Sequence, residues 1–357
     1  MNQKLRFFFT ISALVLLFGC ANEIDVASEY KDIPLIYGKL SAVDSVHYIR
    51  IQKGFLSNTT SAYTMAKYRD SIYYKENELE VFLIDTKTNQ KFVLNRVDGK
   101  DYGLVKDTGD FYSDNNILYR FVAKLTPFNT YTISCRNLLN QTTFSATSNL
   151  IGEFNFRSPN ISPNATVPPI IFFTKQDSIW TDVSFSITTA NSGEDFSSNI
   201  AGIDIQMFYE EWNANTPANV TTKSITWNAY PLSNMIVNSN NYEMKVKGAS
   251  FFSAFSEIEV NPNLVRRLLQ KTKVKIRIIN KDYAVFMATT QAQSSSISSD
   301  EALPVYTNVK NGRGIFYSDT YKETDLIKLS PKLADYIACD PSYRALQFLN
   351  STDKLCK

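Results

Sequence analysis

Histidine, net charge and phosphate-binding glycine patterns are scarce in this 357-residue chain, and each scarcity excludes a class of function. The one histidine, His47, lies on an alternating stretch without the partners that a metal site or a Ser-His-Asp relay needs, so we interpret it as structural. The 37 basic and 35 acidic residues give a formal charge of only +2, too little to attract nucleic acid. We therefore expect no metal, no cofactor and no nucleic-acid partner.

Two other patterns could carry chemistry, and each has a simpler structural explanation. Glu210 and Glu211 are adjacent, and neighbours on a strand point to opposite faces, so the two carboxylates cannot converge on one substrate. The run Asn311-Gly312-Arg313-Gly314 lacks the remaining residues of a phosphate loop and is typical of a turn. No catalytic residue is predicted, and we do not expect an enzyme.

The start of the chain has the layout of an export signal. Lys4 and Arg6 give it positive charge, the apolar run from Phe7 to Phe18 is too short to span a bilayer, and Gly19 precedes Cys20. These last residues resemble the bacterial lipobox, in which the cysteine is acylated and becomes residue one. The alternatives are an ordinary secretory signal and an uncleaved membrane helix.

Residues 1–19 are thus predicted to be a lipoprotein signal peptide and residues 20–32 an acidic tether. Removal of the signal leaves 338 residues with 35 basic and 35 acidic side chains. Acyl chains on Cys20, such as palmitate, would bury CH₂ groups at about 0.8 kcal/mol each and attach the protein to the membrane. The acidic tether resembles the surface-export signals of Bacteroidota lipoproteins, which implies an outer-membrane protein exposed at the cell surface. A soluble tether facing the periplasm is the alternative.

Three cysteines remain once Cys20 is acylated. The envelope is oxidising, so we predict a disulfide between Cys339 and Cys356, worth about 3 kcal/mol on the loop-entropy model. Cys135 alternates with polar neighbours and is predicted to be a small buried hydrophobic residue.

Residues 33–156 are predicted to form an immunoglobulin-like β-sandwich. Between residues 33 and 150 seven short stretches have the composition and alternation of strands: 34–40, 47–53, 78–84, 92–94, 118–124, 130–134 and 142–148. The segment from Ser57 to Tyr74 has four tyrosines and no period, which indicates a long excursion at one end of the sandwich.

Residues 157–169 hold four prolines and are predicted to be a linker to a second β-rich domain, residues 170–357. Two short helices are expected there, one beginning at Asn261-Pro262 and one at Ser330-Pro331, because a cap residue precedes proline in both. The serine-rich residues 291–300 are expected to form a loop, after which residues 304–306 resume a strand.

Five cations could form a basic stripe on the second domain. Lys245 and Lys247 alternate with apolar residues, as do Lys273, Lys275 and Arg277. If the two strands are neighbours, the stripe faces a partner; a merely solvated sheet face is the alternative.

Three Asp-Ser-aliphatic triplets resemble the O-glycosylation sequon of Bacteroidota. They place possible glycans on Ser45, Ser71 and Ser178. The alternative is that Asp-Ser forms a turn ahead of a strand.

The stretch from Pro304 to Phe316 is similar to the N-x-x-N-G-x-G-x-F signature of a Bacteroidota outer-membrane lipoprotein family of unknown function. Arg313 departs from that pattern, where a small apolar residue is usual. The resemblance implies surface or periplasmic exposure and frequent encoding beside TonB-dependent receptors. The leading hypothesis is a non-enzymatic accessory or binding partner of an outer-membrane β-barrel, possibly a TonB-dependent transporter. The alternatives are a surface adhesin or structural lipoprotein and an envelope glycan hydrolase.

Overall fold

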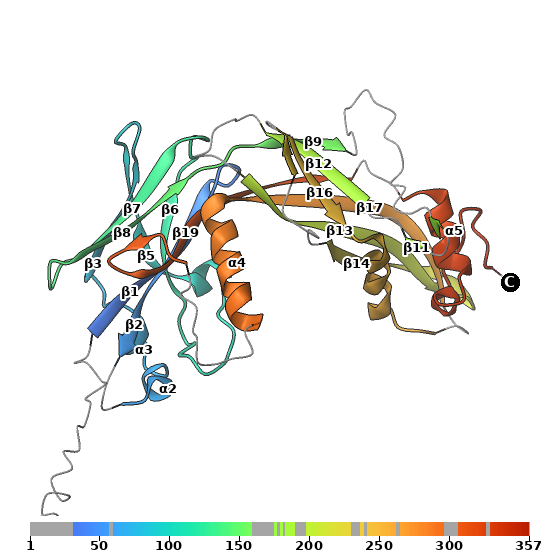
Figure 1. Ribbon diagram of the computed structural model, residues 1–357. Coiled ribbons are helices and arrows are strands. Elements are labelled where there is room, and N and C mark those ends of the chain that lie inside the picture. Colours follow the sequence, from blue (N-terminus) through green and yellow to red (C-terminus); the bar gives the residue numbers. More distant parts are fainter. Residues whose placement is uncertain are drawn as a thin grey trace, which may run out of the picture.

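The computed structural model describes residues 31–56, 60–158, 175–176, 179–180, 183–189, 198–229, 236–238, 241–261, 265–295, 306–325 and 329–356. The predicted signal peptide, the predicted lipidation site Cys20 and most of the predicted tether lie outside these residues. The described chain is mostly β, as predicted, and forms two sandwiches that share one sheet (Figure 1).

The shared sheet has eight strands. In spatial order they are β14 (Thr216–Ala229), β13 (Ser198–Asn213), β17 (Val265–Asn280), β19 (Arg313–Thr324), β1 (Lys31–Ser41), β2 (Val46–Leu56), β6 (Ile117–Val122) and β5 (Asn95–Asp98). Neighbouring strands are antiparallel except β1 and β19, which are parallel.

Two smaller sheets pack on the shared one. The first contains β18 (Val309–Lys310), β8 (Thr143–Asn149), β7 (Thr130–Asn137), β3 (Leu79–Asp85) and β4 (Lys91–Val93). The second contains β15 (Ile236–Asn238), β16 (Asn241–Val246), β12 (Val183–Thr189) and β9 (Phe154–Ser158), and β10 (Lys175–Gln176) pairs with β11 (Ile179–Trp180). The helical elements are α2 (Ala62–Met65), α3 (Arg69–Ile72), η1 (Gly99–Tyr102), η3 (Gly248–Glu257), α4 (Lys281–Ser295), α5 (Pro331–Cys339) and η4 (Arg344–Leu346).

The first sandwich follows directly from period-two alternation. In β3, Val81 and Leu83 are buried, whereas Glu80, Phe82 and Ile84, which alternate with them, are more exposed. They meet Ile36 and Ile49 of the shared sheet in one apolar core, which Phe316 of β19 completes. Burial of one such side chain contributes about 1.5–3 kcal/mol. The predicted N-terminal β-sandwich is therefore confirmed, although one of its strands comes from the other end of the chain.

The second sandwich has a larger and more aromatic core. Ile205 and Ile276 of the shared sheet face Phe185 and Met244 of the second small sheet. The end of this core is closed by η3, α5 and the C-terminal segment. Phe251 of η3 meets Trp227 of β14 edge to face, with ring centroids 5.4 Å apart. Such pairs add about 0.5–1.5 kcal/mol to the burial of their area.

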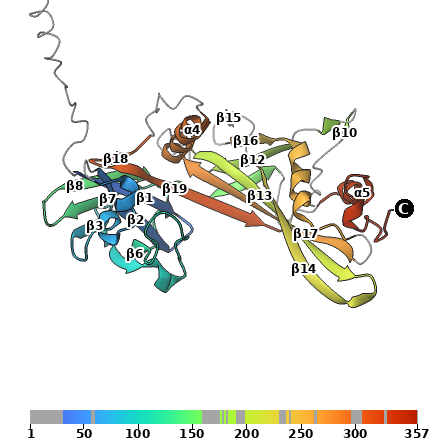
Figure 2. The same cartoon turned by 90° about the horizontal axis from the view of Figure 1, so that it is seen from below.

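Strand β19 belongs to both sandwiches (Figure 2). Its first half pairs with β1 from Arg313 to Asp319, and its second half pairs with β17 from Asp319 to Thr324. At the crossing, the Ser318 hydroxyl donates to the carbonyl of Asn149 at 2.7 Å and accepts from the amide of Ile151 at 3.2 Å. The strand therefore joins the two bodies through continuous backbone pairing rather than through a linker alone.

Several expected boundaries differ in the structure. Residues 157–158 end β9, which pairs with β12, and residues 159–169 of the linker are outside the described part. The helix expected after Asn261-Pro262 is wrong, because β17 begins at Val265 and pairs with β13 over nearly its whole length. The loop expected from residue 291 is wrong as far as Ser295, where α4 ends. In the predicted strand at 304–306, only Tyr306 is described, and it is not in a strand.

The C-terminal segment confirms two predictions. Ser330 caps α5 by accepting from the amide of Leu333 at 3.2 Å, with Pro331 at the first helical position. Cys339 and Cys356 are joined in a disulfide, with their Cα atoms 5.1 Å apart.

Arg267 fastens the same segment to the shared sheet. It is 2% exposed, and its guanidinium donates to Glu211 at 2.7 Å, to the carbonyl of Leu346 at 2.5 Å and to that of Glu259 at 2.9 Å. Its backbone also pairs with the segment, through a bridge to Phe348. A buried cation with three acceptors is satisfied rather than reactive.

Candidate interaction surface

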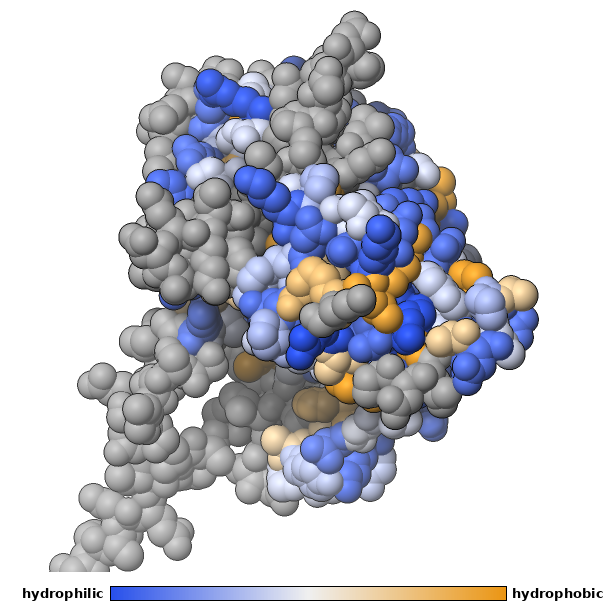
Figure 3. All heavy atoms as spheres, turned by 90° about the vertical axis from the view of Figure 1, so that its right-hand side faces the viewer, coloured by the Kyte–Doolittle hydropathy of each residue, from blue (hydrophilic) through white to orange (hydrophobic). Residues whose placement is uncertain are grey.

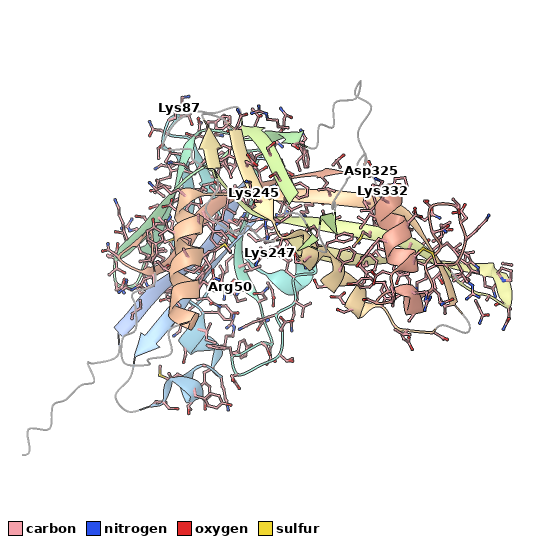
Figure 4. All side chains as sticks on the ribbon, turned by 45° about the vertical axis from the view of Figure 1, so that its right-hand side comes forward. Arg50, Lys87, Lys245, Lys247, Asp325 and Lys332 are labelled. Atoms are coloured by element: carbon pink, nitrogen blue, oxygen red, sulfur yellow. A yellow bond between two sulfur atoms is a disulfide. The ribbon has the colours of Figure 1, made fainter. Side chains whose placement is uncertain are left out.

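The predicted basic stripe is not formed, because its two strands are not neighbours. β16, which carries Lys245, pairs with β12 and β15, whereas β17, which carries Lys273, Lys275 and Arg277, pairs with β13 and β19. The two strands pack their inner faces on one core, so their outward rows face opposite sides of the sandwich. Figure 4 labels Lys245 and Lys247.

Two of the stripe's lysines are also already paired. Glu323 of β19 lies 2.5 Å from the Nζ of Lys273 and 3.4 Å from that of Lys275. These ion pairs lower the pKa of Glu323 and bind the lysines to their own sheet. The row of cations on β17 is therefore a solvated sheet face whose lysines pair within the sheet. This was the alternative interpretation of the sequence pattern.

His47 and Glu211 have structural positions. His47 is 3% exposed and stacks on Phe121 with ring centroids 4.7 Å apart, and burial lowers its pKa. Burial alone would raise the pKa of Glu211, but hydrogen bonds from Lys223 and Arg267 outweigh it and lower that pKa. Glu211 therefore serves an ion-pair network.

The asparagines of the Asn-Gly signature tie strands together. The side-chain amide of Asn308 donates to the carbonyl of Phe316 at 2.7 Å and to that of Thr147 at 3.1 Å, and its oxygen accepts from the amide of Phe316. Asn311 donates in the same way to the carbonyl of Thr143 at 3.0 Å. Both residues thereby fasten the β18–β19 turn to β8.

The glycines of the signature allow β19 to approach β1. Gly314 has φ +110°, and a Cβ there would overlap the carbonyl oxygen of Ile36. A Cβ on Gly312 would come within 2.6 Å of the carbonyl oxygen of Pro34. The predicted turn is confirmed, and the signature has a structural role in placing the shared strand.

The tyrosine-rich excursion is divided between core and surface. Tyr73 and Tyr74 are buried, at 1% and 3% exposure, whereas Tyr63 and Tyr68 are 55% and 62% exposed. The two short helices α2 and α3 support it, with Ser61 capping α2.

A second segment, residues 99–116, packs beside this excursion. The amide of Tyr112 donates to the carbonyl of Ala66 at 2.8 Å, and the Tyr63 hydroxyl donates to Asp110 at 3.2 Å. Beneath them Tyr73 forms a small apolar cluster with Ile72 and Ile117. Sequence reasoning missed this segment because it has no period; its only signal is apolar residues in an otherwise polar loop.

Together the two segments expose a cluster of apolar side chains that we call the tether-end surface. Its members are Tyr63, Tyr68, Leu104, Val105 and Phe111, each at least 39% exposed. Lysines lie over two of the rings, with the Nζ of Lys67 4.2 Å from the Tyr63 centroid and that of Lys106 5.8 Å from the Phe111 centroid. Clustered exposed aromatics of this kind mark contact sites.

The tether-end surface lies where the N-terminal segment joins the fold. Lys31 begins β1 opposite Leu56, the last residue of β2, and the excursion follows directly. Asp98 of β5 pairs with Ile117 of β6 at this same end, so the loop between them emerges there too. Figure 1 shows α2 and α3 beside the start of β1, remote from α5 at the other end of the molecule. Figure 3 views that other end, where apolar groups lie among polar side chains.

The possible glycosylation sites are differently placed. Ser45 is exposed in the β1–β2 turn, and Ser71 is half-buried within α3. Ser178 lies outside the described residues. Glycosylation stays a prediction.

In the part of the chain that the structure describes, there is no group of three His, Cys, Asp or Glu that could hold a metal, and no helix is long and apolar enough to cross a membrane. Comparisons with protein-family models, curated proteins and solved structures gave no match.

Proposed function

We propose that this protein is a lipoprotein held in the outer membrane by acyl chains on Cys20 and exposed at the cell surface. It acts without catalysis, as an accessory or binding partner of an outer-membrane β-barrel, possibly a TonB-dependent transporter. The lipobox-like start, the acidic tether and the resemblance to a Bacteroidota lipoprotein family support the location.

The position of the tether-end surface carries this proposal. Exposed aromatics gather at the end of the body that the tether enters, so an anchored molecule turns them toward the membrane. A partner in the same membrane is then presented at high effective concentration, and a weak contact suffices. The continuous sheet keeps the second sandwich at a fixed offset from the tether-end surface.

The experiment is cross-linking in intact cells, followed by purification and mass spectrometry. We expect the wild-type protein to carry a β-barrel, and the Cys20→Ala variant to lose palmitate labelling, membrane association and the cross-link. Labelling of the variant at the wild-type level would refute the anchor. A wild-type protein that is isolated alone after cross-linking would refute the accessory role.

A further inference from the structure

The tether-end surface combines aromatic and aliphatic side chains that protrude from a firmly built base. We infer that it lies in the lipid headgroup layer of the membrane that holds Cys20, so that the body touches this membrane at two points. The inference rests on the lipid anchor of the proposed function and names what the surface contacts.

The side chains fit an interfacial position. Val105, Tyr68 and Phe111 are 69%, 62% and 59% exposed. Tyrosine is enriched at membrane–water interfaces because its ring is apolar and its hydroxyl is polar. Lys67, which lies over the Tyr63 ring, can extend its ammonium group toward water or phosphate while its stem stays among apolar groups.

The base beneath these side chains is ordered by hydrogen bonds. Lys106 donates to the carbonyl of Tyr112 at 2.5 Å, and the Tyr112 hydroxyl donates to Asn115 at 2.8 Å. Asn115 in turn donates to Asp98, and the Tyr73 hydroxyl donates to the carbonyl of Asn115 at 3.2 Å. Because these hydrogen bonds already hold the loop in one conformation, contact with the membrane costs little further conformational entropy.

The length of the tether favours lipid as the occupant. Ten residues lie between Cys20 and Lys31, and such a chain reaches at most about 40 Å when fully extended. The tether-end surface therefore stays close to the bilayer whether or not a protein partner is nearby.

The balance of charge near the tether-end surface also favours lipid as the occupant. Residues 60–74 and 99–116 together hold four basic and five acidic side chains, so no strong field selects an oppositely charged protein or an anionic lipid. Insertion of apolar side chains, rather than charge attraction, would supply the affinity.

The test uses acylated protein purified in detergent and reconstituted into phosphatidylcholine vesicles whose acyl chains carry bromine. Phe111→Trp places a fluorophore on the tether-end surface. Val220→Trp is the matched control, because Val220 is also exposed, at 48%, but lies on the β13–β14 hairpin of the other sandwich. We expect bromolipid to quench the added emission of Phe111→Trp about threefold more than that of Val220→Trp, because only the first lies at the interface.

Equal quenching of the two variants would overturn the inference, as would quenching that requires phosphatidylglycerol. Tyr68→Trp is a second reporter if Phe111→Trp fails to fold. Protein that does not float with the vesicles shows that the anchor, and so the proposed function, has failed. Protein that floats unquenched, yet is cross-linked in cells from position 111 to a β-barrel, shows that the occupant is protein and that the inference alone is wrong.

Discussion

Replacement of Arg267 by methionine should destabilise the second sandwich more than any neighbouring substitution. The guanidinium is 2% exposed and donates to one carboxylate and two carbonyls. Its removal leaves the Oε2 of Glu211 and the two carbonyl oxygens without this donor, while Lys223 still donates to the Oε1 of Glu211. Removal of one member of a buried ion pair costs about 3–5 kcal/mol, which corresponds to a fall of roughly 10 °C in Tm for about 200 residues.

Arg266→Met is the matched control for this prediction. Arg266 is adjacent and half-buried, but its side chain donates only neutral hydrogen bonds, to Gln347 at 3.1 Å and to the preceding carbonyl. Its loss should cost about 1 kcal/mol. Calorimetry and urea unfolding would measure both variants. If Arg267→Met unfolds within about 0.5 kcal/mol of Arg266→Met, which is the usual error of such comparisons, the network does not hold the C-terminal segment.

The same ion-pair network makes the stability of the folded protein depend on pH. The pKa of Glu211 is lowered in the folded state, so the folded protein binds fewer protons than the unfolded chain in acid. Its stabilisation is complete above the unfolded value of about 4.3 and is lost as the pH falls through the lower folded pKa. Glu211→Gln should flatten the stability profile in this window, and an unchanged profile would contradict the assignment.

Three further predictions concern other parts of the fold. Gly314→Ala should lower the urea midpoint of the first sandwich, because its φ of +110° and the close strand leave no room for a Cβ, and an unchanged midpoint would refute this. Peptide mapping without reductant should recover Cys339 linked to Cys356, while Cys135, whose thiol pKa is raised by burial, should resist iodoacetamide until the protein unfolds. His47 has a lowered pKa, so the unfolded chain binds more protons and stability should fall as the pH drops below about 6.5; His47→Phe should reduce this slope, and a steeper one would count against the buried neutral ring.

Local signals in the sequence predicted the elements that depend on local chemistry. Ser330-Pro331 begins α5, Asn311-Gly312 forms a turn, and alternation marks the strands of the first sandwich. Each of these needs only neighbouring residues, so each could be predicted without knowledge of the fold.

The predictions from sequence were wrong where contacts with residues distant in the chain determine the structure. Asn261-Pro262 has a helix-start signal, yet the following residues form β17 because β13 offers a partner strand about 65 residues earlier. The basic stripe failed because alternation fixes the face of a strand but not its neighbour. Only part of the tether-end surface was predicted. The tyrosines from Ser57 to Tyr74 indicated an excursion, whereas residues 99–116 join it only because β5 and β6 place the loop between them at the same end.

The shared strand also determines when the protein can fold. Val309 and Phe316 belong to the core of the first sandwich, although nearly 300 residues separate them from β1. During synthesis the N-terminal half thus lacks its completing strand until the chain is almost finished. Pairing of such high contact order is slow and leaves apolar surface uncovered meanwhile. Fragments that end near residue 156 should therefore fail to fold.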